Sequence, residues 1–594
     1  MTARNWQNLV EMFIDQLERF GDKPFLLAKT GQAYQSQSWR EVGEQVAKLA
    51  AALREMGVQA GDRVALVSEN RPEWLIADFA IMAAGGVSVP MYTTSTPHDH
   101  LHILENSGAK GVIVSTQALA AKVLPLAHQL NTVNFVIAID PPQISQRLNV
   151  NIHDWKSVIA RSSGTISEVA QRARPLKRPD TACITYTSGT GGAPKGVMIH
   201  HGALLHNCEG AADVVKGLKI KNYIFLSFLP LSHAYEHLAG QFLPMAIGGR
   251  IAYAEGVEKL ATNLTEVRPT IMTAMPRLFE LFRSRILRAI KDKGGLSEKL
   301  FMRALELGTR KHQQPRTMSL REKLENLLLD LLVRRKVRKR FGGRLAAFVS
   351  GGAPLYAEVG LFFQALGVQL LQGYGQTESA PLISVNRPGS AKMHTVGPPV
   401  RNTEVRIAED GEILVRGELV THGYWRDAEA TAKAIRDGWL HTGDIGILDD
   451  DGHLEITDRK KDIIVNDKGD NVSPQRIEGM LTLEPEIAQA MVYGDRKPHL
   501  VGLLVPDAEW MRSWARANDQ QNDFQQLTSN PAFRRAIDAA VSRLNKRLSN
   551  LERVRRFTFA TEPFTIENEQ MTPTLKVRRH KVIETYRDQL EALY

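Results

Sequence analysis

The sequence predicts an α/β protein with a large N-terminal domain of doubly wound sheets and a smaller α+β C-terminal domain. Short apolar segments alternate with helix-like stretches through the first half of the chain, as in parallel sheets whose crossovers are helices. The strand-like segments are 64–67, 87–89, 111–114 and 133–138, and the helix-like ones are 72–84 and 116–130. With 594 residues, the chain is also too long for a single hydrophobic core.

The second half departs from this alternation. Residues from about 284 to 340 are helical in pattern and rich in leucine, and strand character returns at 346–349. After about 400 the strands become shorter and antiparallel in character, as in Glu412–Arg416, which predicts a small β-barrel-like part.

A charged segment at 457–462 separates two β-rich regions and is expected to act as a hinge. We therefore predict a large domain at 1–457, a hinge at 458–461 and a small domain at 462–594. Two domains that meet at a polar linker often close over a ligand.

The composition, with 43% hydrophobic and 24% charged residues, is that of a globular protein. Its two cysteines, Cys183 and Cys208, are too few for a disulfide framework or a zinc site and favour a reducing, cytoplasmic setting. The N-terminus reads as an amphipathic helix rather than a signal peptide. The most apolar window, 75–91, contains Asp78 and is shorter than the ~20 residues of a membrane span, so we expect no transmembrane segment.

The net charge of +10 favours an anionic partner: nucleic acid, an acidic membrane or a polyanionic substrate. Residues 334–344 carry seven basic side chains and no acid, and such a run is either a solvated helix face or a binding surface. The rest of the chain has no interleaved basic and aromatic surface and no recognisable nucleic-acid module, so no nucleic acid is expected.

The segment 186–197, YTSGTGGAPKGV, has the composition of a phosphate-binding loop. Glycines let backbone N–H groups approach phosphate oxygens, and the hydroxyls add donors. It is not a Walker A loop, because Pro194 precedes Lys195 and the segment connects two strand-like runs. A flexible surface loop is the alternative. The expected phosphate contacts are Thr187, Ser188, Gly189, Thr190, Gly191 and Lys195.

A second motif, 373–378, follows a strand-like run. Tyr374 offers a flat face to stack on a base, Thr377 a hydroxyl for a phosphate, and Glu378 a carboxylate for Mg²⁺. Magnesium is commonly held by one or two carboxylates together with substrate phosphates and water. A turn with incidental polar residues is the alternative reading.

Four further segments contain candidate site residues. Asp444 ends the run 439–444, where a carboxylate can accept two ribose hydroxyls, although aspartates near arginines are more often in surface ion pairs. The turn 350–355 lets a planar ring lie against backbone, as many strand-to-helix turns do. His233, in 229–237, is a candidate whose alternative is a buried structural histidine. The segment 571–576 ends at a lysine that is otherwise one more cation in a basic tail.

Taken in their order along the chain, the six segments closely resemble the motifs of the adenylate-forming superfamily: acyl-CoA synthetases, adenylation domains and firefly luciferase. The resemblance runs from about residue 25 to 585. It implies that Gly352 and Ala353 form the adenine-binding turn, that Asp444 binds ribose and that Arg459 gives a second ribose or phosphate contact. The catalytic residues it implies are Lys576, Thr377, Glu378 and His233, with Glu378 as the Mg²⁺ ligand.

The resemblance implies a two-step reaction. A carboxylic acid attacks the α-phosphate of ATP to give acyl-AMP and pyrophosphate, and a thiol then displaces AMP. It also implies that the C-terminal domain rotates about Lys461 between the steps, withdrawing Lys576 and moving the loop around Gly469 towards the pantetheine channel of CoA. The basic helical insertion at 284–345 is similar to that of long-chain acyl-CoA synthetases. A long-chain fatty acid, ATP and CoA are therefore the expected substrates.

The basic, leucine-rich helix at 324–344 also suits an anionic membrane surface. We expect a cytoplasmic protein, peripheral on the inner face of a membrane, that makes contact through 284–345. Two alternatives to a CoA ligase stay open. One is an acyl-AMP ligase that serves a carrier protein, although no extra insertion is evident near 390–455. The other is a non-catalytic acyl- or nucleotide-binding protein, against which the intact motifs argue.

Overall fold

A seven-stranded sheet forms the first layer of the N-terminal domain in the computed structural model, which describes residues 5–142, 148–187, 193–314, 317–572 and 576–594. Its strand order is β7-β6-β5-β3-β4-β8-β9, parallel except for the β8–β9 hairpin. The strands are β3 (Arg63–Val67), β4 (Val87–Met91), β5 (Gly111–Val114), β6 (Phe135–Ala138), β7 (Asn151–Asp154), β8 (Thr181–Thr187) and β9 (Lys195–His200).

Apart from Arg63 at the start of β3, the strands β3, β5 and β6 are apolar and buried, which is the pattern of parallel strands covered by helices. The strands predicted at 64–67, 87–89, 111–114 and 133–138 are confirmed, as are the helices at 72–84 and 116–130 to within a few residues. The helices of this region are α1 (Leu9–Phe20), α2 (Trp39–Glu55), α3 (Pro72–Ala83), α4 (Pro97–Ser107), α5 (Gln117–Gln129), α6 (Trp155–Arg161) and α7 (Ile166–Ala173).

An eight-stranded sheet forms the second layer, in the order β15-β14-β13-β12-β10-β11-β1-β2. Its inner strands are parallel, and its two edge strands are antiparallel. The strands are β1 (Pro24–Thr30), β2 (Ala33–Ser38), β10 (Ile224–Ser227), β11 (Arg250–Tyr253), β12 (Ile271–Ala274), β13 (Ala347–Ser350), β14 (Leu370–Tyr374) and β15 (Ser384–Val385).

The largest hydrophobic core contains helices of both layers, among them α1, α2, α3 and α8 (His201–Lys216). Leucine, phenylalanine and tryptophan side chains of α1, α2, α3 and the segment after β10 fill the largest core. The helices are α8 (His201–Lys216), α9 (Ala234–Glu236), a π-helical turn (His237–Phe242), α10 (Leu243–Ala246), α11 (Leu260–Val267), α16 (Ala357–Ala365) and a 3₁₀ turn (Thr377–Ser379).

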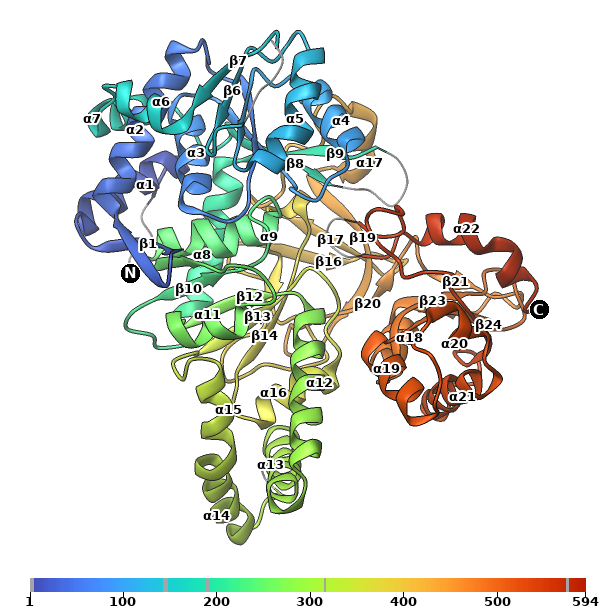
Figure 1. Ribbon diagram of the computed structural model, residues 1–594. Helices are drawn as coiled ribbons and strands as arrows, with labels where there is room; N and C mark the ends of the chain where they lie inside the picture. Colours follow the sequence, from blue (N-terminus) through green and yellow to red (C-terminus); the bar gives the residue numbers. More distant parts are fainter. Residues whose placement is uncertain (1–4, 143–147, 188–192, 315–316, 573–575) are drawn as a thin grey trace.

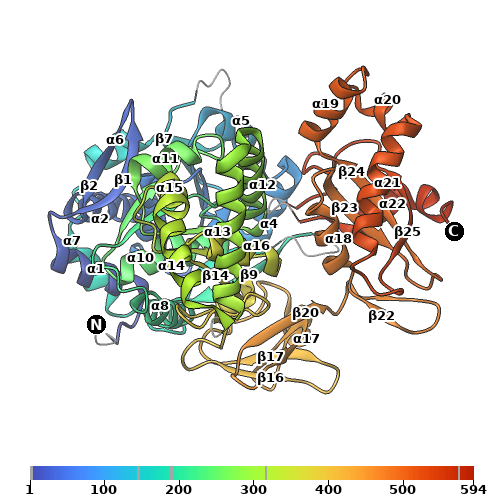
Figure 2. The same ribbon diagram turned by 90° about the horizontal axis from the view of Figure 1, so that it is seen from below.

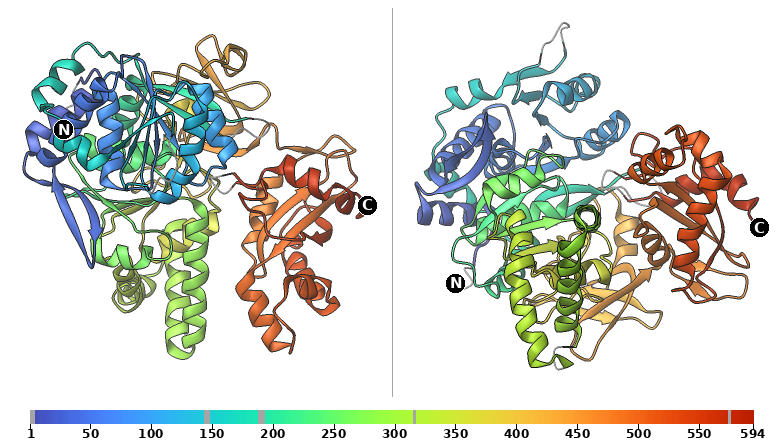
Figure 3. Two further views of the ribbon diagram at one scale, coloured as in Figure 1. Left: turned by 45° about the horizontal axis from the view of Figure 1, so that its top comes forward. Right: turned by 60° about the horizontal axis from the view of Figure 1, so that its bottom comes forward.

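The helical region predicted from 284 to 340 begins earlier, at Pro276, and is divided into several helices. Together they project from the body of the protein, with α14 near the tip (Figures 1 and 3). We call these elements the helical projection. They are α12 (Pro276–Lys293), α13 (Gly295–Gln313), α14 (Leu320–Leu329), a π-helical turn (Asp330–Arg334) and α15 (Arg335–Arg340).

The basic run 334–344 is not one continuous charged face. Arg334 is 4% exposed and donates hydrogen bonds to backbone oxygens of Ala304, Asn326 and Ala365. Arg338 is paired with Asp330 at 2.8 Å. Five of the seven basic side chains are therefore left at the surface, because one serves as an internal clamp and another is neutralised.

The short strands after residue 400 form a five-stranded antiparallel sheet, as their pattern predicted. Its described strands pair as an open sheet, in the order β16-β17-β19-β18 with β20 on β19. The elements are β16 (Glu404–Ile407), β17 (Glu412–Arg416), α17 (Ala428–Ala434), β18 (Ile435–Arg436), β19 (Trp439–Leu448) and β20 (Leu454–Arg459).

The C-terminal part is a separate α+β body with its own core, seen beside the rest of the molecule in Figure 2. A three-stranded sheet, β23-β24-β25, is covered by helices, and a two-stranded ribbon follows the hinge segment. The elements are β21 (Ile464–Val465), β22 (Asn471–Val472), α18 (Pro474–Thr482), β23 (Ile487–Tyr493), β24 (Leu500–Pro506), α19 (Ala508–Ala517), α20 (Phe524–Ser529), α21 (Pro531–Asn545), β25 (Val554–Phe559) and α22 (Arg579–Glu591).

Among the described residues, no helix is both long and apolar enough to cross a bilayer.

Candidate active site

A cavity of about 2500 Å³ lies where the second sheet, the antiparallel sheet and the C-terminal body meet. Most of the residues singled out from the sequence line it: Thr187, Lys195, His233, Gly352, Ala353, Tyr374, Thr377, Glu378, Asp444, Arg459, Lys461 and Lys576. Ser188, Gly189, Thr190 and Gly191 lie outside the described residues. Gly469 is described, but it lies in an exposed turn between β21 and β22 and is not part of the cavity wall.

The candidate phosphate loop connects the two strands of a β-hairpin. Thr187 ends β8 and Lys195 begins β9, and the two residues face each other in the hairpin register. The Lys195 ammonium lies 3.2 Å from Asp427 and 5.3 Å above the ring of Tyr424. The strand–loop–strand arrangement predicted for 186–197 is therefore present at both described ends of the segment.

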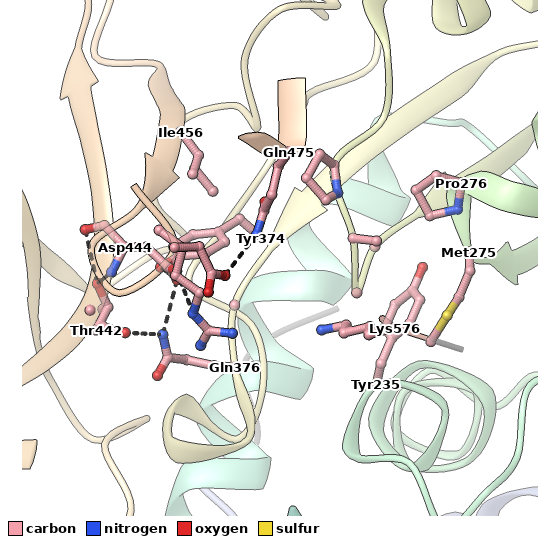
Figure 4. A pocket seen from close by; sticks show the side chains of 18 of the residues that line it. Tyr235, Met275, Pro276, Tyr374, Gln376, Thr442, Asp444, Ile456, Gln475 and Lys576 are labelled. Atoms are coloured by element: carbon pink, nitrogen blue, oxygen red, sulfur yellow. Dashed lines mark hydrogen bonds and ion pairs between the residues drawn. The ribbon is translucent and has the colours of Figure 1, made fainter. Parts of the chain in front are cut away.

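Asp444 is at the centre of a polar cluster on the cavity wall. Tyr374 Oη donates to its Oδ2 at 2.6 Å, and Gln376 Nε2 donates to the same oxygen at 3.2 Å (Figure 4). Arg459 Nε lies 3.4 Å from Oδ1. Asp444 and Arg459 are direct register partners on β19 and β20, so the hairpin explains how residues 15 positions apart meet. Burial raises the pKa of Asp444, and the guanidinium of Arg459 opposes that rise.

Glu378 lies in the 3₁₀ turn that follows β14, and its Oε1 accepts a 2.7 Å hydrogen bond from Tyr424 Oη. Among the described residues, no group of three or more His, Cys, Asp or Glu side chains is arranged around a common metal position. One carboxylate beside a polyphosphate fits Mg²⁺, which retains phosphate and water ligands. Glu378 is therefore a suitable protein ligand for this ion.

Lys576 enters the cavity from the C-terminal body and points towards the Asp444 cluster (Figure 4). Withdrawal from bulk solvent lowers its pKa, although water still reaches the side chain, and Arg459 lowers it further. The carboxylates of Asp444 and Glu378 act in the opposite direction. The lysine is thus placed among both cationic and anionic groups.

His233 precedes α9, and its Nδ1 accepts a hydrogen bond from the backbone N–H of Tyr235 at 3.1 Å. Desolvation, with a further contribution from Lys576, lowers its pKa to about 3. The imidazole is therefore neutral at ordinary pH. The structure accommodates both interpretations of this histidine, because it lines the cavity and also caps a helix.

The turn 350–355 follows β13 and presents backbone to the cavity. A Cβ atom on Gly351 would lie 3.1 Å from the ring of Tyr235, and Gly352 has a φ of +80°. Tyr235 is held in place by a 2.9 Å hydrogen bond from its hydroxyl to the backbone oxygen of Val349. The absence of side chains on these glycines leaves a flat surface on which a planar ring fits.

The predicted hinge, 458–461, overlaps the end of β20: Asp458 and Arg459 belong to the strand, and Lys460 and Lys461 follow it. Lys460 is fixed to the large domain, since its backbone N–H bonds Gly443 at 2.9 Å and its ammonium pairs with Asp410 and Glu412 at 2.5 and 3.1 Å. Lys461 is exposed and carries no such pair within the described residues. Lys460 is therefore held by the large domain, whereas Lys461, one position later, has no ion pair with a described residue.

Sequence reasoning missed three residues that organise the site: Tyr235, Gln376 and Tyr424. Gln376 stands inside a motif that was read, but its side chain was not assigned a role. Tyr424 is separated from Glu378 by 46 positions, and only folding brings the two together. The cavity-lining rings of Tyr235 and Tyr424 carry no local signal that distinguishes them from ordinary core tyrosines.

Comparison with known proteins assigns the chain to a family. The family description "AMP-binding enzyme" matches residues 13–425, and its C-terminal domain matches residues 461–594. The chain belongs to the AMP-binding enzyme family. As the motif analysis predicted, it is a member of the adenylate-forming superfamily and is most like the long-chain acyl-CoA synthetases.

Several curated relatives align with almost the whole chain. A long-chain-fatty-acid–CoA ligase of Mycobacterium bovis, FadD15, is 35% identical over 562 residues, covering 93% of this chain and 91% of the relative. Human long-chain-fatty-acid–CoA ligase 6 is 31% identical and covers 99% of this chain and 87% of the relative. The adenylation domain of a Mycobacterium chelonae carboxylate reductase has the same fold, with a TM-score of 0.75, 22% identity and coverage of 100% and 92%.

Proposed function

We propose that this chain activates long-chain fatty acids, first forming acyl-AMP from the acid and ATP and then transferring the acyl group to CoA. The chain is an AMP-forming ligase. A long-chain acid is favoured because a single cavity is lined both by the polar cluster and by an apolar wall. This wall is formed by aliphatic and aromatic side chains of α8, β10, the first π-helical turn, α10 and β12, including Val214, Val215, Phe225, Leu238, Leu243 and Ile271.

In the first step, a carboxylate oxygen of the acid attacks the α-phosphorus of ATP, and the bond to the β-phosphate oxygen breaks to release pyrophosphate. Lys576 offsets the negative charge that builds up on the α-phosphate. Asp444 accepts hydrogen bonds from the ribose, and the turn at Gly352 and Ala353 receives the adenine. His233 lines the same cavity, and its neutral imidazole is expected to lie beside the acid.

Glu378 is the residue that would hold Mg²⁺ beside the phosphates, and the ion would supply charge neutralisation there. Thr377 and Lys195 add a hydroxyl and a cation to the same phosphate region. The described end of the candidate loop, Thr187, continues this set of donors.

In the second step, the CoA thiolate attacks the acyl carbon, the bond to AMP breaks and AMP leaves. The thiol proton passes to solvent. We propose that the C-terminal domain, 462–594, rotates about Lys461 before this step, which takes Lys576 out of the cavity and moves the Gly469 turn towards the thiol channel. The exposed position of Gly469 and the fixed position of Lys460 support this proposal.

We also propose that the enzyme works in the cytoplasm, at the inner face of a membrane that it meets through 284–345. Long-chain fatty acids partition into bilayers because each buried CH₂ contributes ~0.8 kcal/mol. A peripheral enzyme would take its acid from that phase.

The test is pyrophosphate release from ATP, measured for acids from acetate to oleate with and without CoA. We expect AMP and pyrophosphate to form fastest with long acids and CoA to stimulate turnover. Acyl-AMP that forms but ignores CoA would instead indicate transfer to a carrier protein. If no acid releases pyrophosphate, the chain is a non-catalytic binder and the proposal fails.

A further inference from the structure

Six leucines at the end of the helical projection point into solvent. They are 51–79% exposed, although leucine side chains of this size are normally buried. They recur at helical spacing along α14 and the π-helical turn after it, and we call them the leucine stripe. The stripe consists of Leu320, Leu324, Leu327, Leu328, Leu331 and Leu332.

The opposite side of the same helix already has its partners. Leu329 and Val333 are buried in the second core together with Phe301 and Leu307. The helix is therefore docked on the protein by one side, and the leucine stripe is not required for that packing. Monomeric proteins rarely leave contiguous apolar patches uncovered unless the patch binds something.

The exposed charges of the stretch that contains the leucine stripe, 320–344, are of one sign. Every exposed charged side chain from 320 to 344 is basic: Arg321, Lys323, Arg335, Lys336, Lys339, Arg340 and Arg344. The three acids of this stretch are partly buried and neutralised, since Glu322 pairs with Arg310, Glu325 with Arg303 and Asp330 with Arg338. Within the described residues, none of the seven exposed basic side chains forms an ion pair.

We propose that the leucine stripe is a membrane-docking surface that inserts into the interface of an anionic bilayer. A helix with leucines on one side and lysines and arginines beside them lies in the plane of the interface, with its apolar side among the acyl chains. The basic residues reach anionic headgroups within a Debye length. The position of α14 near the tip of the helical projection allows it to touch a flat surface (Figure 1).

A second copy of this chain is the main competing occupant. A symmetric dimer through the leucine stripe would bring two sets of unpaired basic side chains together with no exposed acid between them. Such like-charge contact is unfavourable. Charge complementarity therefore favours a lipid surface over a dimer. The inference rests on the proposed function in that it names the side chains that would make the membrane contact proposed there for 284–345.

The experiment is flotation of the full-length protein with vesicles of phosphatidylglycerol and phosphatidylethanolamine, and with vesicles of phosphatidylcholine alone. We expect binding to the anionic vesicles that weakens with salt. The variant L327S/L331S should lower the partition coefficient at least tenfold, because two inserted leucines are lost. The variant K336Q/K339Q should weaken binding at low salt and have little effect at high salt.

The matched control is V257S, because Val257 is as exposed as Leu331, at 55%, but lies in a surface loop away from the stripe. It should bind vesicles as the unchanged protein does. Turnover of octanoate, a water-soluble acid, should be the same for all these variants, which shows that they are folded. This assay separates failure of docking from failure of the proposed reaction, because flotation needs neither ATP nor acid.

Three outcomes would overturn the inference. The first is that the unchanged protein fails to float with anionic vesicles at low salt. The second is that L327S/L331S floats as well as the unchanged protein. In the third, the protein self-associates in the absence of lipid and L327S/L331S makes it monomeric, which assigns the leucine stripe to a second copy of the chain.

Discussion

A phenol group from a distant part of the chain orients the carboxylate of Glu378. Tyr424 Oη donates to it at 2.7 Å, and the Tyr424 ring also lies beneath the ammonium of Lys195. Lys195 in turn pairs with Asp427, three positions after Tyr424. One short segment therefore connects the candidate metal ligand with the candidate phosphate loop. We regard Tyr424 as a positioning residue, since it acts through Glu378.

Removing this hydroxyl should weaken metal binding. We expect Y424F to raise the Mg²⁺ concentration needed for half-maximal adenylation about tenfold, because a hydrogen bond to a charged group contributes ~1.5–3 kcal/mol. Binding of Mn²⁺, followed by electron paramagnetic resonance with a non-hydrolysable ATP analogue, should weaken in parallel. The control is Y34F, which removes a hydroxyl bonded to the backbone oxygen of Tyr253, away from the cavity. Lower turnover with unchanged Mn²⁺ affinity would contradict the positioning role.

The charge of Lys576 should set an alkaline limit on adenylation. Its pKa lies below the usual range of lysine, so the ammonium loses its proton at a lower pH and kcat/KM falls as pH rises through that value. K576R should move this limit upward, because arginine stays protonated. K576A should lower adenylation ~100- to 1000-fold and abolish the fall of kcat/KM at alkaline pH. The measurement is ATP–pyrophosphate exchange from pH 6 to 10. If kcat/KM of K576R falls at the same pH as that of the unchanged protein, the fall belongs to another group.

Among the elements, the helical projection depends on one buried arginine. Arg334 lies in the π-helical turn and donates to backbone oxygens on α13, on α14 and at the end of α16. It also bonds the Asn326 side chain at 2.7 Å. The guanidinium supplies five donors in a fixed plane, so this one side chain bonds the backbone of three different helices. This residue therefore stabilises the platform that presents the leucine stripe.

Replacing Arg334 should loosen the helical projection without unfolding the rest. We expect R334M to cost ~3 kcal/mol in local opening, because the hydrogen bonds from the buried guanidinium to three different helices are lost. Hydrogen exchange of residues 295–345 should accelerate, while the β3–β6 strands keep their protection. Its neighbour Arg335 is exposed and unpaired within the described residues, so R335M should change exchange by less than ~0.5 kcal/mol. Equal effects of the two changes would contradict the stabilising role of Arg334 in the helical projection.

The comparison of elements shows where sequence reasoning works. Strands such as Val64–Val67 and the Leu370–Tyr374 region are predictable, because runs of apolar residues and the turns after them are local signals. Which basic side chains of 334–344 are buried and which are exposed was not predictable. Whether Arg334 is buried and Arg335 exposed depends on which side of one helix meets α16, and a charge run carries no such information. Likewise, the Tyr424–Glu378 contact arises from tertiary packing alone.

On the scale of the whole molecule, the two domains are joined by a contact that tolerates no side chain. The phenol ring of Tyr356, from the large domain, packs directly against Gly479 on α18 of the C-terminal body. A Cβ atom there would lie 1.0 Å from Tyr356 Oη, which itself donates to the backbone oxygen of Gln475 at 3.1 Å. This contact belongs to the arrangement in which Lys576 lies in the cavity. The proposed rotation about Lys461 would separate the two residues.

A methyl group at Gly479 should therefore affect one half-reaction only. We expect G479A to lower ATP–pyrophosphate exchange about 100-fold, since a displacement of Lys576 by 1 Å suffices for such a loss. Transfer from preformed acyl-AMP to CoA should stay within about twofold. The helix itself should not suffer, because alanine is a better helix former than glycine by ~1 kcal/mol. Adenylation and transfer that fall together would contradict either the rotation or the integrity of the variant.

Tyr356 offers the matching rescue. Y356A removes the obstructing phenol, so the double variant G479A/Y356A should recover most of the adenylation that G479A loses. Y356A alone should cost less, because it gives up one hydrogen bond and some apolar contact while leaving α18 free to approach. The coupling between the two changes measures the clash itself, since each single change acts on the same contact. Additive losses would mean that Gly479 and Tyr356 act separately, and the orientation of the domains in adenylation would then depend on other contacts, such as the pairing of Arg547 with Glu358.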